Sequence, residues 1–275
     1  MAIVAVGQMT STASMAHNLK QCQLLVKKAV KAGAKALFLP EASDWISSSP
    51  QETLSLVKPV TESPFVLGLQ AEAKREKLPI HVGIHEPGSD PQKVKNTVVW
   101  IDENGEITQR YQKIHLFDVE IKDGPVLKES NSVEPGTKIL PPFQTPVGKV
   151  ASTICFDLRF PEITLALKRQ GAEIITFPSA FTVPTGKDHW EILLRARAIE
   201  TQCYVIAAAQ VGKHNEMRTS YGHSMIVDPW GRILADVGGK EDEPEIATAT
   251  IDRELLKKIK TEMPLLRRTD VYPEV

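Results

Sequence analysis

Cysteine is scarce in this sequence, and neither sign of charge is in excess. The 275 residues include three cysteines, and 33 Lys and Arg residues nearly balance 34 Asp and Glu residues, for a net charge of −1. Cys22, Cys155 and Cys203 lie far apart and form no CxxC pair, which disfavours both a disulfide framework and a zinc ribbon. A balanced charge provides no bulk field for attracting nucleic acid or an anionic membrane. We therefore expect a reducing compartment, and neither nucleic acid nor a membrane as partner.

Long apolar runs and phosphate-binding loops are also missing. No stretch reaches the ~20 apolar residues of a membrane helix, and the N-terminal segment lacks the basic flank and long apolar core of a signal peptide. No GxGxxG or GxxxxGK[ST] pattern occurs, so nothing supports a nucleotide cofactor. His81 and His85 have a spacing seen in helical metal sites, but on a strand it only repeats every second residue. The sequence predicts a cytoplasmic protein without metal or cofactor, and leaves mitochondrial copies open.

Apolar segments with strand and helix periodicity alternate along the chain. The first half has expected strands at 3–8, 36–40, 80–84, 96–101 and 107–111, with expected helices at 15–32 and 64–77. After a polar, loop-rich stretch at 114–146, the pattern restarts with strands at 150–153, 173–177 and 203–208 and helices at 162–170 and 188–201. This order predicts an α/β fold in one domain, residues 1–275.

Cys155 ends an apolar strand, and Pro161 suits the first turn of a following helix. Such a strand-to-helix elbow exposes a thiol near backbone N–H groups, whose positive potential favours the nucleophilic thiolate. The alternative is an inert, buried cysteine, since free cysteine is among the most buried residue types.

Glu41 and Lys113 each follow a predicted strand. The carboxyl ends of strands are where α/β folds assemble their sites. For Glu41 the alternative is an acid at a helix N-terminus, and for Lys113 it is a solvated surface lysine. Three histidines could pair with Cys155, but none lies in a local signature of that chemistry: His115, His189 and His223.

Three ordered motifs surround these residues: Leu37-Phe-Leu-Pro-Glu41, Tyr111-Gln-Lys113-Ile-His-Leu-Phe117 and Ile154-Cys155-Phe-Asp-Leu-Arg159-Phe-Pro-Glu162. With them the chain resembles the nitrilase (carbon-nitrogen hydrolase) superfamily over nearly its whole length, and Ser220-Tyr-Gly-His-Ser-Met225 is similar to its Nit branch. The resemblance implies a four-layer αββα sandwich. It also implies that Glu41 is the general base, Lys113 the electrophilic stabiliser and Cys155 the nucleophile, with Glu129 as a second glutamate of the site.

The activity implied by this resemblance is that of a cysteine amidase acting on a small amide that carries an α-keto acid. It would convert deaminated glutathione to 2-oxoglutarate and cysteinylglycine through a thioester. An ω-amidase acting on 2-oxoglutaramate or related dicarboxylic acid monoamides is the alternative, and a non-catalytic binding protein is a further one. Glu41 would take the thiol proton, a role that suits a buried carboxylate with a raised pKa.

Four further residues are hypothesised to bind substrate. The Phe156 N–H would join Lys113 in binding the oxyanion. Arg159 would clamp a substrate carboxylate, with a structural ion pair as the alternative, and Phe181 and Thr185 would line the acyl pocket. The resemblance further implies a homodimer that pairs through the helix after Cys155 and the helix near 188–201.

Overall fold

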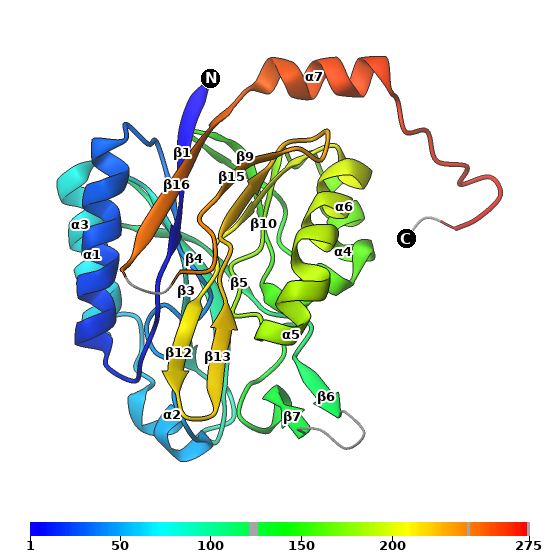
Figure 1. The fold of residues 1–275 in the computed structure, drawn as a ribbon. Coiled ribbons are helices and arrows are strands. Elements are labelled where there is room, and N and C mark those ends of the chain that lie inside the picture. Colours follow the sequence, from blue (N-terminus) through cyan, green and yellow to red (C-terminus); the bar gives the residue numbers. More distant parts are fainter. Residues whose placement is uncertain (121–125, 241–242, 274–275) are drawn as a thin grey trace.

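Two six-stranded sheets form the centre of the computed structural model, which describes residues 1–120, 126–240 and 243–273 (Figure 1). The first sheet has the order β16-β1-β2-β3-β4-β5. Its strands are β1 (Ala2–Gln8), β2 (Leu37–Phe38), β3 (Ile80–Pro87), β4 (Val94–Ile101), β5 (Ile107–Gln112) and β16 (Glu245–Ile251). Strand β2 is short and pairs in parallel with β1 on one side and β3 on the other, so it lies in the interior of the sheet.

The second sheet has the order β15-β14-β11-β10-β9-β8. Its strands are β8 (Phe143–Thr145), β9 (Gly148–Ser152), β10 (Ile174–Thr176), β11 (Tyr204–Ala207), β14 (Met225–Val227) and β15 (Ile233–Asp236). Strands β9, β10 and β11 run parallel, so their carboxyl ends meet at one edge. A separate hairpin of β12 (Val211–Asn215) and β13 (Arg218–Tyr221) follows β11.

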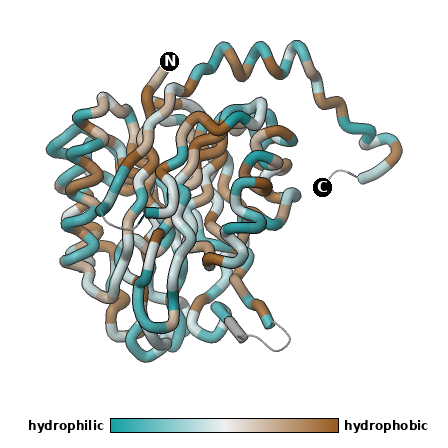
Figure 2. Tube along the Cα trace, viewed as in Figure 1, coloured by the Kyte–Doolittle hydropathy of each residue, from teal (hydrophilic) through white to brown (hydrophobic). Residues whose placement is uncertain are grey.

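Helices cover the outer face of each sheet. On the first sheet α1 (Met15–Lys31) and α3 (Pro64–Glu76) share a buried apolar cluster with the strands, and on the second α4 (Pro161–Arg169) and α6 (Glu191–Thr201) do the same. A third cluster, including Val6, Phe38 and Ile206, joins the two sheets face to face. Figure 2 shows these helices alternating between hydrophilic and hydrophobic residues, as expected for helices with one buried face. The αββα sandwich predicted from the sequence is confirmed.

Several elements were not predicted. They are α2 (Pro50–Leu56), the β12–β13 hairpin, and, within the stretch expected to be loop, β6 (Asp118–Glu120), β7 (Val126–Lys128), a 3-10 turn at Glu129–Asn131, and β8. These elements are short and mostly polar, so they lack the periodicity that identifies longer ones. The Gly124-Pro125 pair, within the stretch expected to be loop, lies outside the described residues.

The remaining helices are short or lie near the C-terminus. The helix expected over 188–201 begins with a π-helical turn at Gly186–Trp190 that follows α5 (Val183–Thr185), and α6 itself starts at Glu191. Helix α7 (Arg253–Glu262) leads to the C-terminal segment, which extends away from the sandwich (Figure 1). Among the helices that the structure describes, none has the length and apolar character needed to cross a membrane.

Candidate active site

Two carboxylates and one ammonium group meet in the interior. Lys113 Nζ lies 3.0 Å from Glu41 Oε1 and 2.8 Å from Glu129 Oε2. Lys113 is 2% exposed and Glu41 3% exposed, so water screens this contact little. The solvated lysine and the helix N-terminal acid, the two alternatives from the sequence, are both wrong: Lys113 is buried, and the chain after Glu41 forms a turn, not a helix.

Asn96 on β4 completes this cluster. Its Nδ2 donates to Glu41 Oε1 at 2.7 Å and to Glu129 Oε1 at 3.2 Å. The Phe117 N–H donates to Glu129 Oε2 at 2.6 Å, so Glu129 is fixed from two directions. The other carboxylate oxygen, Glu41 Oε2, is buried and accepts no hydrogen bond from Lys113 or Asn96. The cluster therefore leaves one basic oxygen of Glu41 available for a proton.

The chain holds Glu41 in place through tight backbone contacts. Gly83 on β3 donates to Pro40 O at 3.0 Å and its carbonyl accepts from Ser43 N at 2.9 Å. A Cβ at Gly83 would stand 2.5 Å from Glu41 Cα, so only glycine permits this approach. Gln210 Nε2 donates to the Glu41 carbonyl at 2.9 Å, which links the segment to the second sheet.

Cys155 lies at the predicted elbow, three residues after β9. Its backbone is left-handed, with φ of 47°, and its N–H donates to Pro178 O at 3.0 Å. A non-glycine residue rarely adopts this conformation, which occurs at strained turns that present nucleophiles. The thiol lies beside the Glu41 carboxylate, since each group perturbs the pKa of the other. Glu41, Lys113 and Cys155, from three distant segments, thus share one site.

The pKa values of the site differ from those expected. Burial first, and then the charge of Glu41, raise the pKa of Cys155 above its ordinary value, despite the opposing effect of Lys113. Burial would also raise the pKa of Glu41, but Lys113, Arg218 and hydrogen bonds from Cys155 and Asn96 outweigh it and lower that pKa. The positive potential expected to favour a thiolate is outweighed by burial and by Glu41, so Cys155 keeps the proton that Glu41 is expected to take. The raised pKa expected at Glu41 is wrong, because the sequence does not show how closely Lys113 pairs with Glu41.

Lys113 itself is held in its charged form. Burial alone would lower its pKa, but the charges of Glu129 and Glu41 outweigh burial and raise it. At neutral pH the site therefore holds a neutral thiol, an ionised Glu41 and an ammonium at Lys113. This is a proton donor, a proton acceptor and a cation arranged as nucleophilic attack on a carbonyl requires.

A second hydrogen-bond network, which was not predicted from the sequence, connects the Lys113 segment to the elbow at Cys155. Asp157 is fully buried, and its Oδ2 accepts from Tyr111 OH at 2.7 Å and from Ile154 N at 3.0 Å. Its Oδ1 accepts from His115 N at 3.1 Å and contacts His115 Nδ1 at 2.7 Å. The sequence did contain a signal for this network, because Tyr111 and His115 flank Lys113, and Asp157 follows Cys155 by two residues. Asn96 had no such signal.

Three of the four residues hypothesised to bind substrate, Phe156, Arg159 and Phe181, pack on one another beside Cys155. The Arg159 guanidinium lies over two rings, 5.7 Å from the Phe156 centroid and 5.6 Å from that of Phe181, and its Nη2 is 3.2 Å from His189 Nδ1. Arg159 makes no ion pair with any described residue, so the structural ion pair considered as its alternative is absent. Thr185 Oγ1 lies 2.9 Å from Thr182 Oγ1, within its own turn.

The main-chain N–H of Phe156 donates to no other group in the described part of the chain. Phe156 directly follows Cys155 at the elbow, next to the residue whose sulfur would attack a substrate carbonyl. The structure therefore offers a free N–H donor of the kind that such an oxyanion needs.

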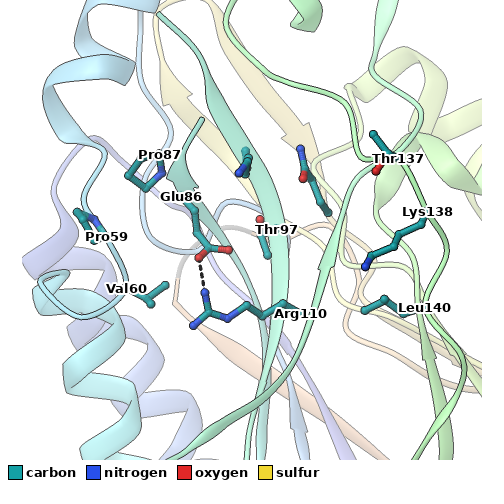
Figure 3. Close-up of a pocket in the computed structure, with 11 residues that line it drawn as sticks. Pro59, Val60, Glu86, Pro87, Thr97, Arg110, Thr137, Lys138 and Leu140 are labelled. Carbon is teal, nitrogen blue, oxygen red and sulfur yellow. Dashed lines mark hydrogen bonds and ion pairs between the residues drawn. The ribbon is translucent and has the colours of Figure 1, made fainter. Parts of the chain in front are cut away.

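A separate cavity of about 430 Å³ is lined by none of the catalytic candidates. Its lining includes Glu86, Thr97, Arg110 and Lys138, and Figure 3 shows the ion pair between Glu86 and Arg110. Because Thr97 follows Asn96 along β4, its side chain points to the opposite face of the sheet. Within the described residues, no group of three or more His, Cys, Asp or Glu residues could hold a metal ion.

Comparison with known proteins identifies the family of this site. Residues 3–261 match the carbon-nitrogen hydrolase family model. The chain belongs to the carbon-nitrogen hydrolase family. It is 48% identical to the probable hydrolase nit2 of Schizosaccharomyces pombe, covering 100% of both chains. It is 46% identical to the deaminated glutathione amidase of Mus musculus, covering 98% of this chain and 84% of the mouse protein.

A solved structure agrees with this family assignment. The crystal structure of the NitFhit protein of C. elegans is 39% identical and superposes with a TM-score of 0.91, covering 98% of this chain and 66% of that longer chain. The sandwich of this carbon-nitrogen hydrolase is thus the fold of its relatives.

Proposed function

We propose that this carbon-nitrogen hydrolase is a cysteine amidase that hydrolyses deaminated glutathione to 2-oxoglutarate and cysteinylglycine. The observation that carries the proposal is the buried contact of Lys113 Nζ with Glu41 and Glu129, beside the Cys155 thiol. The mouse relative named deaminated glutathione amidase supports this substrate. A non-catalytic protein would have no need to bury three ionised groups at one place, because each costs several kcal/mol of desolvation.

The proposed reaction runs through a thioester. Cys155 Sγ attacks the amide carbonyl while its proton passes to Glu41 Oε2, the oxygen that Lys113 and Asn96 do not contact. Lys113 and the Phe156 N–H bind the oxyanion. Glu41 then returns the proton to the leaving nitrogen, the C–N bond breaks and the acyl group stays on sulfur. Glu41 next deprotonates a water, which attacks the thioester and releases the acid and the free thiol.

Arg159 is the proposed partner for the carboxylate at the acyl end. Its guanidinium is half-buried, stacked between the rings of Phe156 and Phe181, and free of an ion pair in the described residues. A guanidinium held in this way binds a carboxylate with two parallel hydrogen bonds. Phe181 and Thr185 would bound the acyl chain. The same acyl pocket would fit 2-oxoglutaramate, so ω-amidase activity is the competing function.

Product analysis tests the two activities. Purified enzyme is incubated at equal concentration with deaminated glutathione and with 2-oxoglutaramate, and cysteinylglycine and ammonia are measured. The proposal predicts faster release of cysteinylglycine, an acyl adduct on Cys155 by intact mass, and no turnover by Cys155→Ala. Faster release of ammonia would favour the ω-amidase, and no turnover of either amide by the parent enzyme would contradict both.

We also propose a homodimer in the cytoplasm, with mitochondria as a second location. Exposed Ile192 and Ile199 on α6 support pairing through this helix, since apolar groups on one helix face are typical of interfaces between subunits. The three unpaired, buried cysteines suit a reducing compartment. Light scattering of the purified chain tests the dimer, and Ile192→Asp should give monomers.

A further inference from the structure

The β12–β13 hairpin connects the two segments that flank the candidate active site. On one side, Asn215 Nδ2 donates to Ser47 O at 3.1 Å, in the segment that follows Glu41. On the other side, Tyr221 N donates to Phe181 O at 2.9 Å. In Figure 1 the hairpin accordingly projects between α2 and α5. Its base is also fastened, because Gln210, directly before β12, donates to the Glu41 carbonyl.

Arg218 stands on the face of this hairpin that is turned toward the Glu41 segment. Side chains directly opposite in an antiparallel pair share one face, and alternate residues of a strand share it too. Arg218 is opposite Asn215 and two residues from Ser220. Asn215 reaches Ser47, and Ser220 Oγ contacts His214 Nε2 at 2.7 Å, whose Nδ1 is 2.8 Å from Ser11 O. All of these contacts lie on the Glu41 side of the hairpin.

The Arg218 side chain is exposed and makes no ion pair with any residue that the structure describes. Its charge nevertheless reaches into the site: after the opposing effect of burial and the larger effect of Lys113, it contributes to the lowered pKa of Glu41. An exposed arginine is usually either paired with an acidic side chain or surrounded by water with no influence on a buried site. Here it is an exposed cation, without an ion pair in the described residues, on the hairpin face turned toward a buried cluster of two carboxylates and one ammonium.

The proposed reaction indicates which side of the scissile amide bond Arg159 and Arg218 each serve. The acid that protonates the leaving nitrogen must lie within hydrogen-bond reach of it, so the leaving amine lies on the side of Glu41. Arg159 packs on Phe156 and Phe181 and interacts with the Cys155 thiol, whereas Arg218 lies on the hairpin face that is turned toward the Glu41 segment. This assignment gives Arg159 to the acyl side of the scissile bond and Arg218 to the leaving-amine side.

We propose that Arg218 binds an anionic group, a carboxylate, on the leaving-amine side of the scissile amide. The enzyme would then select amides that carry negative charge on both sides of the bond being broken. This inference rests on the proposed function and deepens it, because it separates amides with a large anionic leaving group from those that release ammonia. A guanidinium would hold the distal carboxylate by charge-assisted hydrogen bonds.

A cycle of enzyme and substrate variants tests this role. The substrates are deaminated glutathione and its derivative in which the glycine carboxylate is a carboxamide. We expect Arg218→Met to lower kcat/KM for the free acid by about 10- to 100-fold, mainly through KM, because a hydrogen bond to a charged group is lost. For the carboxamide the same variant should stay within about 2-fold of the parent, since there is no charge to bind. Arg218→Lys should recover part of the loss.

Lys213→Met is the matched control. Lys213 is an exposed cation on the other face of the same hairpin, where it pairs with Glu216, so both amides should be hydrolysed as by the parent. Equal loss of both substrates in Arg218→Met, or no loss of either, would overturn the role of Arg218 while leaving the amidase intact. Failure of the parent enzyme to hydrolyse either amide would instead contradict the proposed function.

Discussion

Replacement of Asp157 by asparagine should destabilise this enzyme more than a buried Asp-to-Asn change usually does. The Asp157 carboxylate accepts at both oxygens, from Tyr111 OH and Ile154 N at Oδ2 and from His115 N and Nδ1 at Oδ1. An amide has one acceptor oxygen. In either orientation its NH₂ group faces a backbone N–H, that of Ile154 or that of His115, and neither can accept.

The magnitude follows from these contacts. At least one hydrogen bond to a charged acceptor is lost, which costs about 1.5–3 kcal/mol, and a buried donor is left without a partner at a further ~1–3 kcal/mol. The sum is about 2.5–6 kcal/mol of unfolding free energy. Urea unfolding of the parent and of Asp157→Asn, followed by circular dichroism, measures it from the shift of the midpoint at constant slope.

Asp228→Asn provides the control at a second buried aspartate. There one oxygen, Oδ1, accepts from both Trp230 N and Arg232 N at 2.9 Å, so an asparagine keeps both bonds and should cost less than about 1 kcal/mol. If Asp157→Asn destabilised the protein no more than Asp228→Asn, the reasoning about its four hydrogen bonds would be refuted. Asp157→Asn should also lower kcat more than it raises KM, because this network positions the Lys113 segment against the elbow.

Three further outcomes are expected at the cluster. The pKa of Glu41 is lowered and that of Lys113 is raised, so kcat/KM should be flat from about pH 6 to 9 and should fall only below about pH 4.5. A pH profile of kcat/KM that falls near pH 7 would contradict this ionisation state. Glu129→Gln should cost about 3 kcal/mol in urea unfolding, since it removes a partner of a buried ammonium, and should reduce kcat more than it changes KM. Gly83→Ala should displace Glu41, because the new Cβ would stand 2.5 Å from the Glu41 Cα. We expect a loss of ~1–3 kcal/mol of unfolding free energy in thermal unfolding and a loss of most of the kcat. An unchanged kcat would contradict this, since it would mean that the Glu41 backbone adjusts to the added methyl group.

The fold was largely predictable because its long elements have clear periods. The apolar residues of α1 recur at spacings of three and four, and β1 is an apolar run from Ala2 to Val6. The hairpin with Arg218 was not predictable in this way, because its strands are four or five residues long and mix exposed polar with buried positions. Its place depends on contacts with segments some 170 to 200 residues away, such as the bond from Asn215 to Ser47.

The positions of Glu41, Lys113 and Cys155 at the ends of strands could be deduced from the sequence, but their ionisation could not. A pKa depends on how far a group is buried and on which charges surround it. The contact of Lys113 with two carboxylates comes from three separate segments, and spacing along the chain gives no measure of it. Asn96, which joins those carboxylates, is one asparagine in an apolar strand and has no signature at all.

The lowered pKa of Glu41 first suggests a poor base, yet the geometry explains how it can accept a proton during the proposed reaction. In the free enzyme Lys113 shares its charge between Glu41 and Glu129. As Cys155 attacks, negative charge develops on the carbonyl oxygen, and Lys113 is drawn toward it. Each hydrogen bond that Lys113 gives to the oxyanion is one that Glu41 loses, so the pKa of Glu41 rises while the thiol proton is moving. The base therefore becomes stronger only when a substrate carbonyl is in place, and an empty site keeps its cysteine as an unreactive thiol.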